Sequence, residues 1–150
     1  SFCIYIVFTL NAIYYVSQAG LNPLQLVLLG TIMELAILFF EIPTGLVADF
    51  FGRKKSFIFG TFLIGIAHLL EGSIPTFWAI AIAAALWGIG WTFISGAETA
   101  WIADEIEENE LNRVLLKGAK FASIGSFLGI IVSILIAMVF LVQIAVLIAG

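Results

Sequence analysis

Two glutamates, Glu34 and Glu41, stand in a long apolar segment that contains no lysine or arginine. They are seven residues apart, so a helix places both on one face, two turns from each other. A carboxylate at the centre of a bilayer costs about 2.5–3.5 kcal/mol, and such a group normally faces other helices or a water-filled cavity. If this segment crosses a membrane, Glu34 is either a candidate proton or substrate site or a hydrogen-bonded structural acid. Glu41 then has a structural or gating role.

A stripe of aromatic and polar side chains occupies a later apolar segment. Its members recur every three or four residues, which places them on one helical face: Trp87, Trp91, Ser95 and Glu98. A smaller group lies in the first apolar segment: Asn11, Tyr14 and Tyr15. These side chains are candidate solute contacts, although aromatic side chains in membrane proteins also serve in packing and as interface anchors.

The composition shows which elements position these residues. The chain of 150 residues is 63% hydrophobic and 11% charged, with a mean hydropathy of +1.19. A soluble domain of this size needs more polar surface, whereas lipid solvates apolar helix faces. Since a spanning helix takes about 20 residues, the chain has room for about five spans and part of a sixth. The sequence predicts an all-α polytopic membrane protein with the lipid bilayer as its solvent.

Breaks in the apolar pattern divide the chain into predicted spans. We place them at about 2–16, 23–48, 56–70, 75–103 and 114–139, with a sixth from about 143. Asn22-Pro23 is a helix start signal, because asparagine caps and proline suits the first helical position. No turn signal divides the last apolar run, and we predict a tight turn near 140–143. Both ends lie inside apolar runs, so we expect a fragment truncated on both sides.

The cations set the orientation. All of them follow the second or the fourth predicted span: Arg53, Lys54, Lys55, Arg113, Lys117 and Lys120. By the positive-inside rule, the 2–3 and 4–5 loops are cytoplasmic. We interpret the acidic run 104–110 as a solvated loop face rather than a cation site.

Several classes of protein are not supported. Cys3 is the one cysteine and His68 the one histidine, so we expect neither a disulfide framework nor a metal centre. His68 is expected to have no special role. We find no nucleophile–base pair and no metal-ligand spacing, and therefore expect no enzyme activity. We also expect no cofactor and no nucleic-acid partner.

The loop between the second and third spans, GLVADFFGRKK, has an unusual charge distribution. Asp49 lies in the last turn of a helix, where the helix dipole disfavours a carboxylate by about 0.3–1 kcal/mol. It should therefore have a partner, either Arg53 or the amino end of another helix. Gly45 leaves room for close backbone approach, and Gly52 suits a tight reversal.

The pattern Gly45-x-x-x-Asp49-x-x-Gly52-Arg53-Lys54 resembles the loop 2–3 signature of the major facilitator superfamily (MFS). The segments 41–44 and 95–100, with Asp104, look like bacterial members. The resemblance implies the amino-terminal six-helix bundle of an MFS transporter, built from two inverted three-helix repeats in a bacterial inner membrane. It also implies that the first and fourth spans line the central cavity.

In that family the aspartate and arginine of this loop form a cytoplasmic latch between the two half-domains. The resemblance assigns this role to Asp49 and Arg53, with Asp104 as a third member. Phe50 departs from the family, which usually has arginine there, so we expect a weaker latch or one that rests on Lys54. Proton-coupled drug antiporters of the family carry a proline in the fifth span and an arginine where Ala84 stands here, so that subclass is not supported.

The fifth span carries small residues at spacings of three and four: Gly118, Ala122, Gly125, Gly129 and Ser133. Such a ladder lets another helix approach closely. Taken together, the sequence predicts secondary active transport of a small solute by alternating access, with protons as a candidate coupling ion. A second six-helix bundle of the same chain would complete the site. The alternative is a non-transporting sensor or scaffold on the same fold.

Overall fold

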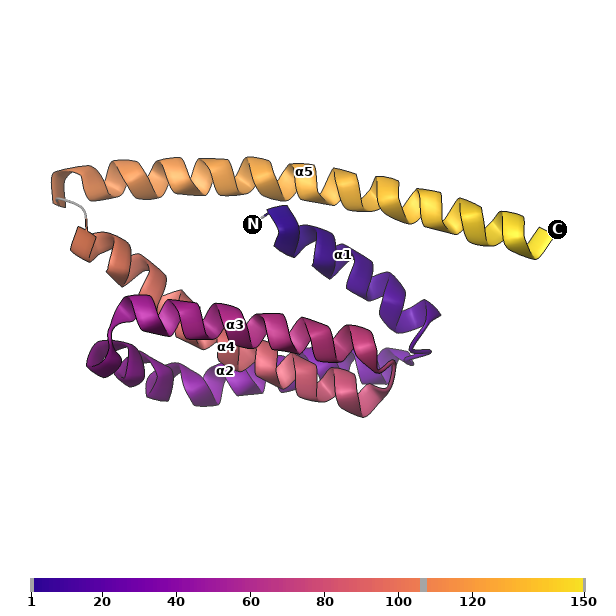
Figure 1. Cartoon of the computed structure of the whole chain (residues 1–150), viewed down its shortest axis with the longest axis horizontal. Helices are drawn as coiled ribbons and strands as arrows, with labels where there is room; N and C mark the ends of the chain where they lie inside the picture. The colour runs from indigo at the N-terminus through magenta and orange to yellow at the C-terminus, as the bar shows by residue number, and fades with distance from the viewer. Residues whose placement is uncertain (1, 106–107, 150) are drawn as a thin grey trace. The chain divides into compact units, whose positions relative to one another are not determined.

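The computed structural model describes residues 2–105 and 108–149, and these ranges fold into helices joined by short connections (Figure 1). The helices are α1 (Phe2–Ser17), α2 (Pro23–Phe51), α3 (Arg53–Ser73), α4 (Phe77–Glu105) and α5 (Glu108–Ala149). The described ranges contain no strand. The all-α prediction is confirmed.

Four segments of the described chain are long and apolar enough to cross a membrane. They are Pro23–Phe51, Arg53–Ser73, Phe77–Ile102 and Asn112–Ile136. The helix α1 has 16 residues, which is shorter than the roughly 20 residues that a complete span needs. The helices α1 to α4 follow the order of the first four predicted spans, and the exact span bounds stay predictions.

The amino end of α2 shows why it begins where the sequence indicates. The Asn22 side chain accepts a hydrogen bond from the backbone N–H of Gln25 at 2.9 Å. In return, the Gln25 side chain accepts one from the backbone N–H of Asn22 at 2.9 Å. This capping box satisfies two amides that the first turn of a helix leaves without partners, and Pro23 follows at the first helical position.

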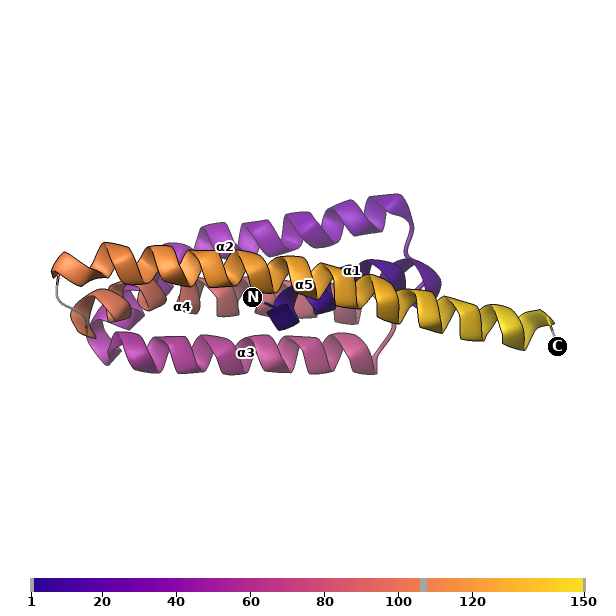
Figure 2. The ribbon, with the colours of Figure 1, turned by 90° about the horizontal axis from the view of Figure 1, so that it is seen from above.

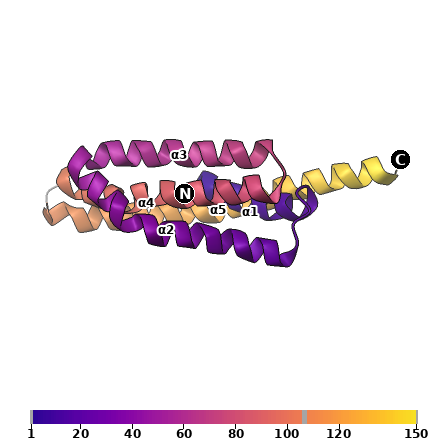
Figure 3. The same ribbon diagram turned by 90° about the horizontal axis from the view of Figure 1, so that it is seen from below.

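The described chain divides into two units, and each is considered by itself. In the unit Ala19–Leu111, α4 lies between α2 and α3 and packs against both (Figures 2 and 3). Contacts between α2 and α3 are few by comparison. The second unit contains α1 and most of α5.

Glycines allow α4 to approach both neighbours closely. A Cβ atom added to Gly60 of α3 would lie 2.6 Å from the backbone oxygen of Gly90, and one added to Gly88 would lie 2.7 Å from the backbone oxygen of Met33 in α2. Real Cβ atoms essentially never come this close to a backbone oxygen. The sequence analysis predicts close helix approach at the small residues of the fifth span, and not at these glycines.

The predicted ladder in α5 is only partly buried. Gly129 and Ser133 are buried, and Ala122 and Gly125 are half-buried. A Cβ added to Gly118 would meet nothing within 4 Å, so the described residues provide no close approach there. A role of the whole ladder in helix packing stays a prediction.

The helix α5 differs from the expected course, because it continues without a break through 140–143, where we predicted a turn. The physical reason is in the sequence, since residues 134–149 contain no glycine or proline that would end a helix. A helix of 42 residues is about 63 Å long, roughly twice the hydrocarbon thickness of a bilayer. Its division into a fifth and a sixth span therefore stays a prediction.

Candidate gating cluster and substrate-binding face

The corner between α2 and α3 is a single glycine. Gly52 has a φ of +99°, which residues with a side chain rarely adopt. Its N–H donates to the Ala48 carbonyl at 3.0 Å, and α3 begins at the next residue. The reversal predicted at Gly52 is confirmed, and it brings Asp49 and Arg53 to the same end of the unit, which we call the Gly52 end.

Arg53 joins α3 to α4 at the Gly52 end. Its Nη1 atom lies 2.6 Å from Oδ2 of Asp104 and donates to the Ala100 carbonyl at 3.1 Å. Its Nη2 atom lies 4.0 Å from Oδ1 of Asp49. The first contact is a charge-assisted hydrogen bond, whereas the last is at the outer limit of an ion pair. Geometry therefore makes Asp104 the principal partner of Arg53, and the Asp49 side chain remains 68% exposed.

Lys54 lies beside an aromatic ring. Its Nζ atom is 5.9 Å from the centroid of the Trp101 ring, and Phe57 contacts the same ring at 6.0 Å between centroids. Among the described residues, the ion pairs at the Gly52 end involve Arg53 and do not include Lys54. Whether the latch rests on Lys54 in place of the missing arginine stays a prediction, and Phe50 is exposed.

Ser56 and Gly45 show where the corner is packed and where it is open. The buried Ser56 donates from its Oγ atom to the Phe93 carbonyl at 2.9 Å, which ties the first turn of α3 to α4. Gly45 is different, because an added Cβ would meet nothing within 4 Å. The close backbone approach expected at Gly45 is therefore not present among the described residues.

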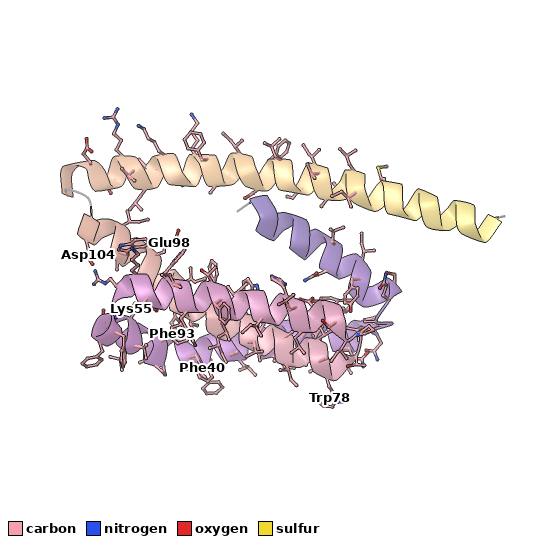
Figure 4. The ribbon with its side chains drawn as sticks, viewed as in Figure 1. Phe40, Lys55, Trp78, Phe93, Glu98 and Asp104 are labelled. Atoms are coloured by element: carbon pink, nitrogen blue, oxygen red, sulfur yellow. The ribbon has the colours of Figure 1, made fainter. Side chains whose placement is uncertain are left out.

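The stripe on α4 forms one side of the three-helix layer. The rings of Trp87 and Trp91 are stacked, with centroids 5.7 Å apart and an interplanar angle of 7°. Trp91 is 37% exposed, Glu98 is exposed and Ser95 is half-buried. In Figure 4, Glu98 points to one side of the layer and Trp78 to the other. This arrangement agrees with the helical spacing read from the sequence.

The two intramembrane glutamates of α2 are exposed and lie beside this stripe. Met33 and Ile37 of α2 pack against Gly88 of α4. Phe40 points to the Trp78 side of the layer (Figure 4). Measured around the axis of α2, Glu34 lies about 120° and Glu41 about 100° from Phe40. Both lie beyond the direction in which α2 faces α4. Helix periodicity therefore predicts that both lie on the side of Glu98.

The two helices also set the level of each acid. They run in the same direction (Figure 1), and Gly88 lies against the stretch from Met33 to Ile37. Glu34 is therefore level with Trp87, and Glu41 lies about 10 Å further toward the Gly52 end. We call this surface the acid–tryptophan face, and its residues are Glu34, Glu41, Trp87, Trp91, Ser95 and Glu98.

The candidate contacts of the first span belong to the other unit. Asn11 and Tyr15 of α1 are half-buried, and the rings of Tyr14 and Tyr15 are 6.1 Å apart with a tilt of 56°. The unit that holds them is separate from the α2–α4 unit. That Asn11 and Tyr15 share a site with the acid–tryptophan face stays a prediction.

A buried acid of α3 was missed by the sequence reasoning. Glu71 is 8% exposed, and its Oε2 atom lies 3.4 Å from Nδ1 of His68. The spacing of three residues on one helix is the available signal, but Glu71 lies just outside the third predicted span, which ends at about residue 70. His68, expected to have no special role, lies in contact with this acid.

Comparison with known proteins identifies the fold. The sequence profile of the Major Facilitator Superfamily matches residues 1–150. The chain belongs to the major facilitator superfamily. An MFS chain with long apolar helices is part of an integral membrane protein, as the signature around Gly52 indicated.

Relatives within this match are named as transporters. One, an uncharacterized transporter from Buchnera aphidicola subsp. Acyrthosiphon pisum (strain APS), is 37% identical over 95 residues, which are 63% of this chain and 23% of that protein. Another, an uncharacterized MFS-type transporter from Bacillus subtilis (strain 168), is 27% identical over 118 residues, which are 76% of this chain and 30% of that protein. The chain thus matches less than a third of the length of either relative.

Proposed function

We propose that this MFS chain is part of a secondary active transporter that moves a small solute across a bacterial inner membrane by alternating access, with protons as the coupling ion. The transporter names of its relatives support the general activity. The observation that carries the mechanism is the contact between Arg53 and Asp104, because it joins two helices beside a single-residue corner. A second six-helix bundle, outside the 150 residues, supplies the rest of the site.

In this proposal the charges of the Gly52 end work as a latch. Arg53 stays on α4 through Asp104 and the Ala100 carbonyl. Asp49 opposes the dipole of its own helix and has only a 4.0 Å contact with Arg53. It therefore gains most from a partner supplied by the second bundle, and it has that partner in only one of the two access states. In this proposal the 2–3 and 4–5 loops are cytoplasmic, which the positive-inside rule favours because the cations of the chain lie around Arg53 and from Arg113 to Lys120.

Cysteine labelling tests alternating access without knowledge of the solute. In full-length protein lacking Cys3, a cysteine at Ser95 should react with an impermeant maleimide from either side of sealed vesicles. Cysteines at Ser73 and Asn112 serve as references for the two loop sides, since the sequence places Ser73 outside and Asn112 inside. Labelling of the Ser95 position from one side alone would favour a sensor or scaffold.

A second variant separates a transporter from a permanently open pore. Asp49→Asn should raise the labelling rate at position 95 from one side and lower it from the other, because the latch stabilises one access state. Glu110→Gln removes an exposed acid that is not one of the partners of Arg53; it is the matched control and should leave both rates unchanged. If Asp49→Asn changes neither rate, the latch role is wrong.

A further inference from the structure

The acid–tryptophan face carries charge of a single sign. The helices α2 and α4 contain no lysine or arginine, and on this face they contribute Glu34, Glu41 and Glu98. All six cations of the chain lie elsewhere, beginning at Arg53. A ligand that enters this face therefore meets carboxylates on two helices and no positive side chain from either of them.

These carboxylates are not neutralised within the described part of the chain. Its ion pairs are those of Arg53 with Asp49 and Asp104, and His68 contacts Glu71. Glu34, Glu41 and Glu98 are all exposed. Charged groups at membrane depth face a cavity or a partner rather than lipid, so the face is suited to a partner of positive charge.

The tryptophans indicate what kind of cation fits. Trp87 and Trp91 stack with nearly parallel planes, and 37% of Trp91 stays exposed beside the acids. Indole is the aromatic ring that attracts a cation most strongly, and it also offers apolar surface to an organic body. A hydrated metal ion makes poor use of such a surface, and the described residues contain no group of three or more side chains that could hold a metal.

We propose that the substrate bound at this face is a monovalent organic cation with an aromatic or otherwise apolar body. The proposal rests on the proposed function, in which the second bundle closes over the face. The body of the cation lies against Trp91, at the exposed edge of the stacked pair. Its charge lies beside Glu98, and Glu41 adds a second carboxylate to the same face from the neighbouring helix.

Tetraphenylphosphonium is a suitable probe, with tetraphenylborate as an anion of the same shape. Both are measured by equilibrium dialysis against full-length protein in detergent micelles. We expect saturable binding of the cation and none of the anion. Trp91→Leu and Glu98→Gln should each weaken cation binding roughly tenfold. Trp91→Phe, which keeps an aromatic ring, should bind more tightly than Trp91→Leu.

Two variants serve as matched controls. Trp78→Leu removes an exposed tryptophan from the opposite side of the layer, and Glu110→Gln removes an exposed acid outside it. Both should bind the cation as the parent does, and every variant is first checked for a monodisperse elution profile. No binding of the cation, equal binding of the anion, or equal loss in the Trp78→Leu variant would each overturn the proposal.

The outcome is separable from that of the transport proposal. If position 95 is labelled from both sides but tetraphenylphosphonium does not bind, the protein alternates between access states and its substrate is not of this class. If the cation binds at the face but position 95 is labelled from one side only, the binding site is present and transport is not.

Discussion

The two polar regions of the α2–α4 unit differ in how their charges are matched. At the Gly52 end, Arg53 lies 2.6 Å from Asp104, so opposite charges compensate each other within the unit. On the acid–tryptophan face, Glu34 and Glu98 have the same sign and take no part in the ion pairs of the described residues. Within the first region the Arg53–Asp104 pair is complete by itself, whereas the carboxylates of the second region have no such partner among the described residues. This difference separates a region that holds two helices together from one that we propose receives a ligand.

Both regions depend on how α4 is held by α3, and a change at their crossing should have the largest effect. Gly60→Ala puts a Cβ atom 2.6 Å from the Gly90 carbonyl oxygen, so the helices must move apart. We expect a loss of about 1–3 kcal/mol of stability, measured by SDS titration of purified protein. Gly65→Ala is the matched control on the same helix, since its Cβ would meet nothing within 4 Å.

The control should be neutral or slightly stabilising, by up to about 1 kcal/mol, because alanine favours a helix more than glycine does. Equal destabilisation by both changes would mean that the crossing is not the point of closest contact. The crossing of Gly60 and Gly90 would then not be what holds both polar regions in position.

The second prediction concerns the region that receives a ligand. Glu34→Gln keeps hydrogen bonding but removes the charge and the site for a coupled proton. In proteoliposomes, we expect proton-driven accumulation of the transported solute to fall to the equilibrated level, while exchange of solute across the membrane largely persists. Stability by SDS titration should stay within about 0.5 kcal/mol of the parent, as is usual for a surface substitution away from packed or paired groups.

Glu41→Gln, on the same face of the same helix, is the companion variant, and we expect it to change gating more than coupling. If Glu34→Gln accumulates solute against a gradient as well as the parent does, Glu34 is a structural acid. The coupling site would then belong to the part of the transporter outside these 150 residues.

The sequence predicted the elements and the family because those signals are local. Apolar length, the Asn22 cap and the Gly52 corner each depend on a few neighbouring residues, and the structure contains all of them. The glycine crossings depend on which helices become neighbours, and nothing in the period of α3 or α4 by itself indicates that Gly60 meets Gly90. The predicted turn at 140–143 had no residue to make it, and α5 continues there.

The features of the candidate site also fall into two groups, those set by local sequence and those set by which helices become neighbours. The spacing of Trp87, Trp91 and Glu98 defined a common helical face before any fold was known. The side to which Glu34 points could not be obtained from α2 alone, because it depends on Gly88 of α4 lying against Met33. The ranking of Asp104 above Asp49 as partner of Arg53 likewise needed the contact between α3 and α4.

The preference of Arg53 for Asp104 over Asp49 involves exposed charges, and we expect its effect on stability to be small. Double-mutant cycles with Arg53→Gln, Asp104→Asn and Asp49→Asn isolate the two pair energies. The side chains of Arg53 and Asp104 are 35% and 60% exposed, so solvent screens their attraction, and we expect a coupling of about 0.5–1 kcal/mol. For Arg53 and Asp49, at 4.0 Å, we expect about 0.3 kcal/mol or less.

Both coupling energies are measured by SDS titration at low and high salt, and the coupling energy between Arg53 and Asp104 should shrink as ionic strength rises. If the coupling energy between Arg53 and Asp49 equals or exceeds that between Arg53 and Asp104, Arg53 binds α2 as strongly as it binds α4. Asp49, Arg53 and Asp104 would then form one cluster whose charges compensate each other. The proposed partner of Asp49 in a second bundle would not be needed.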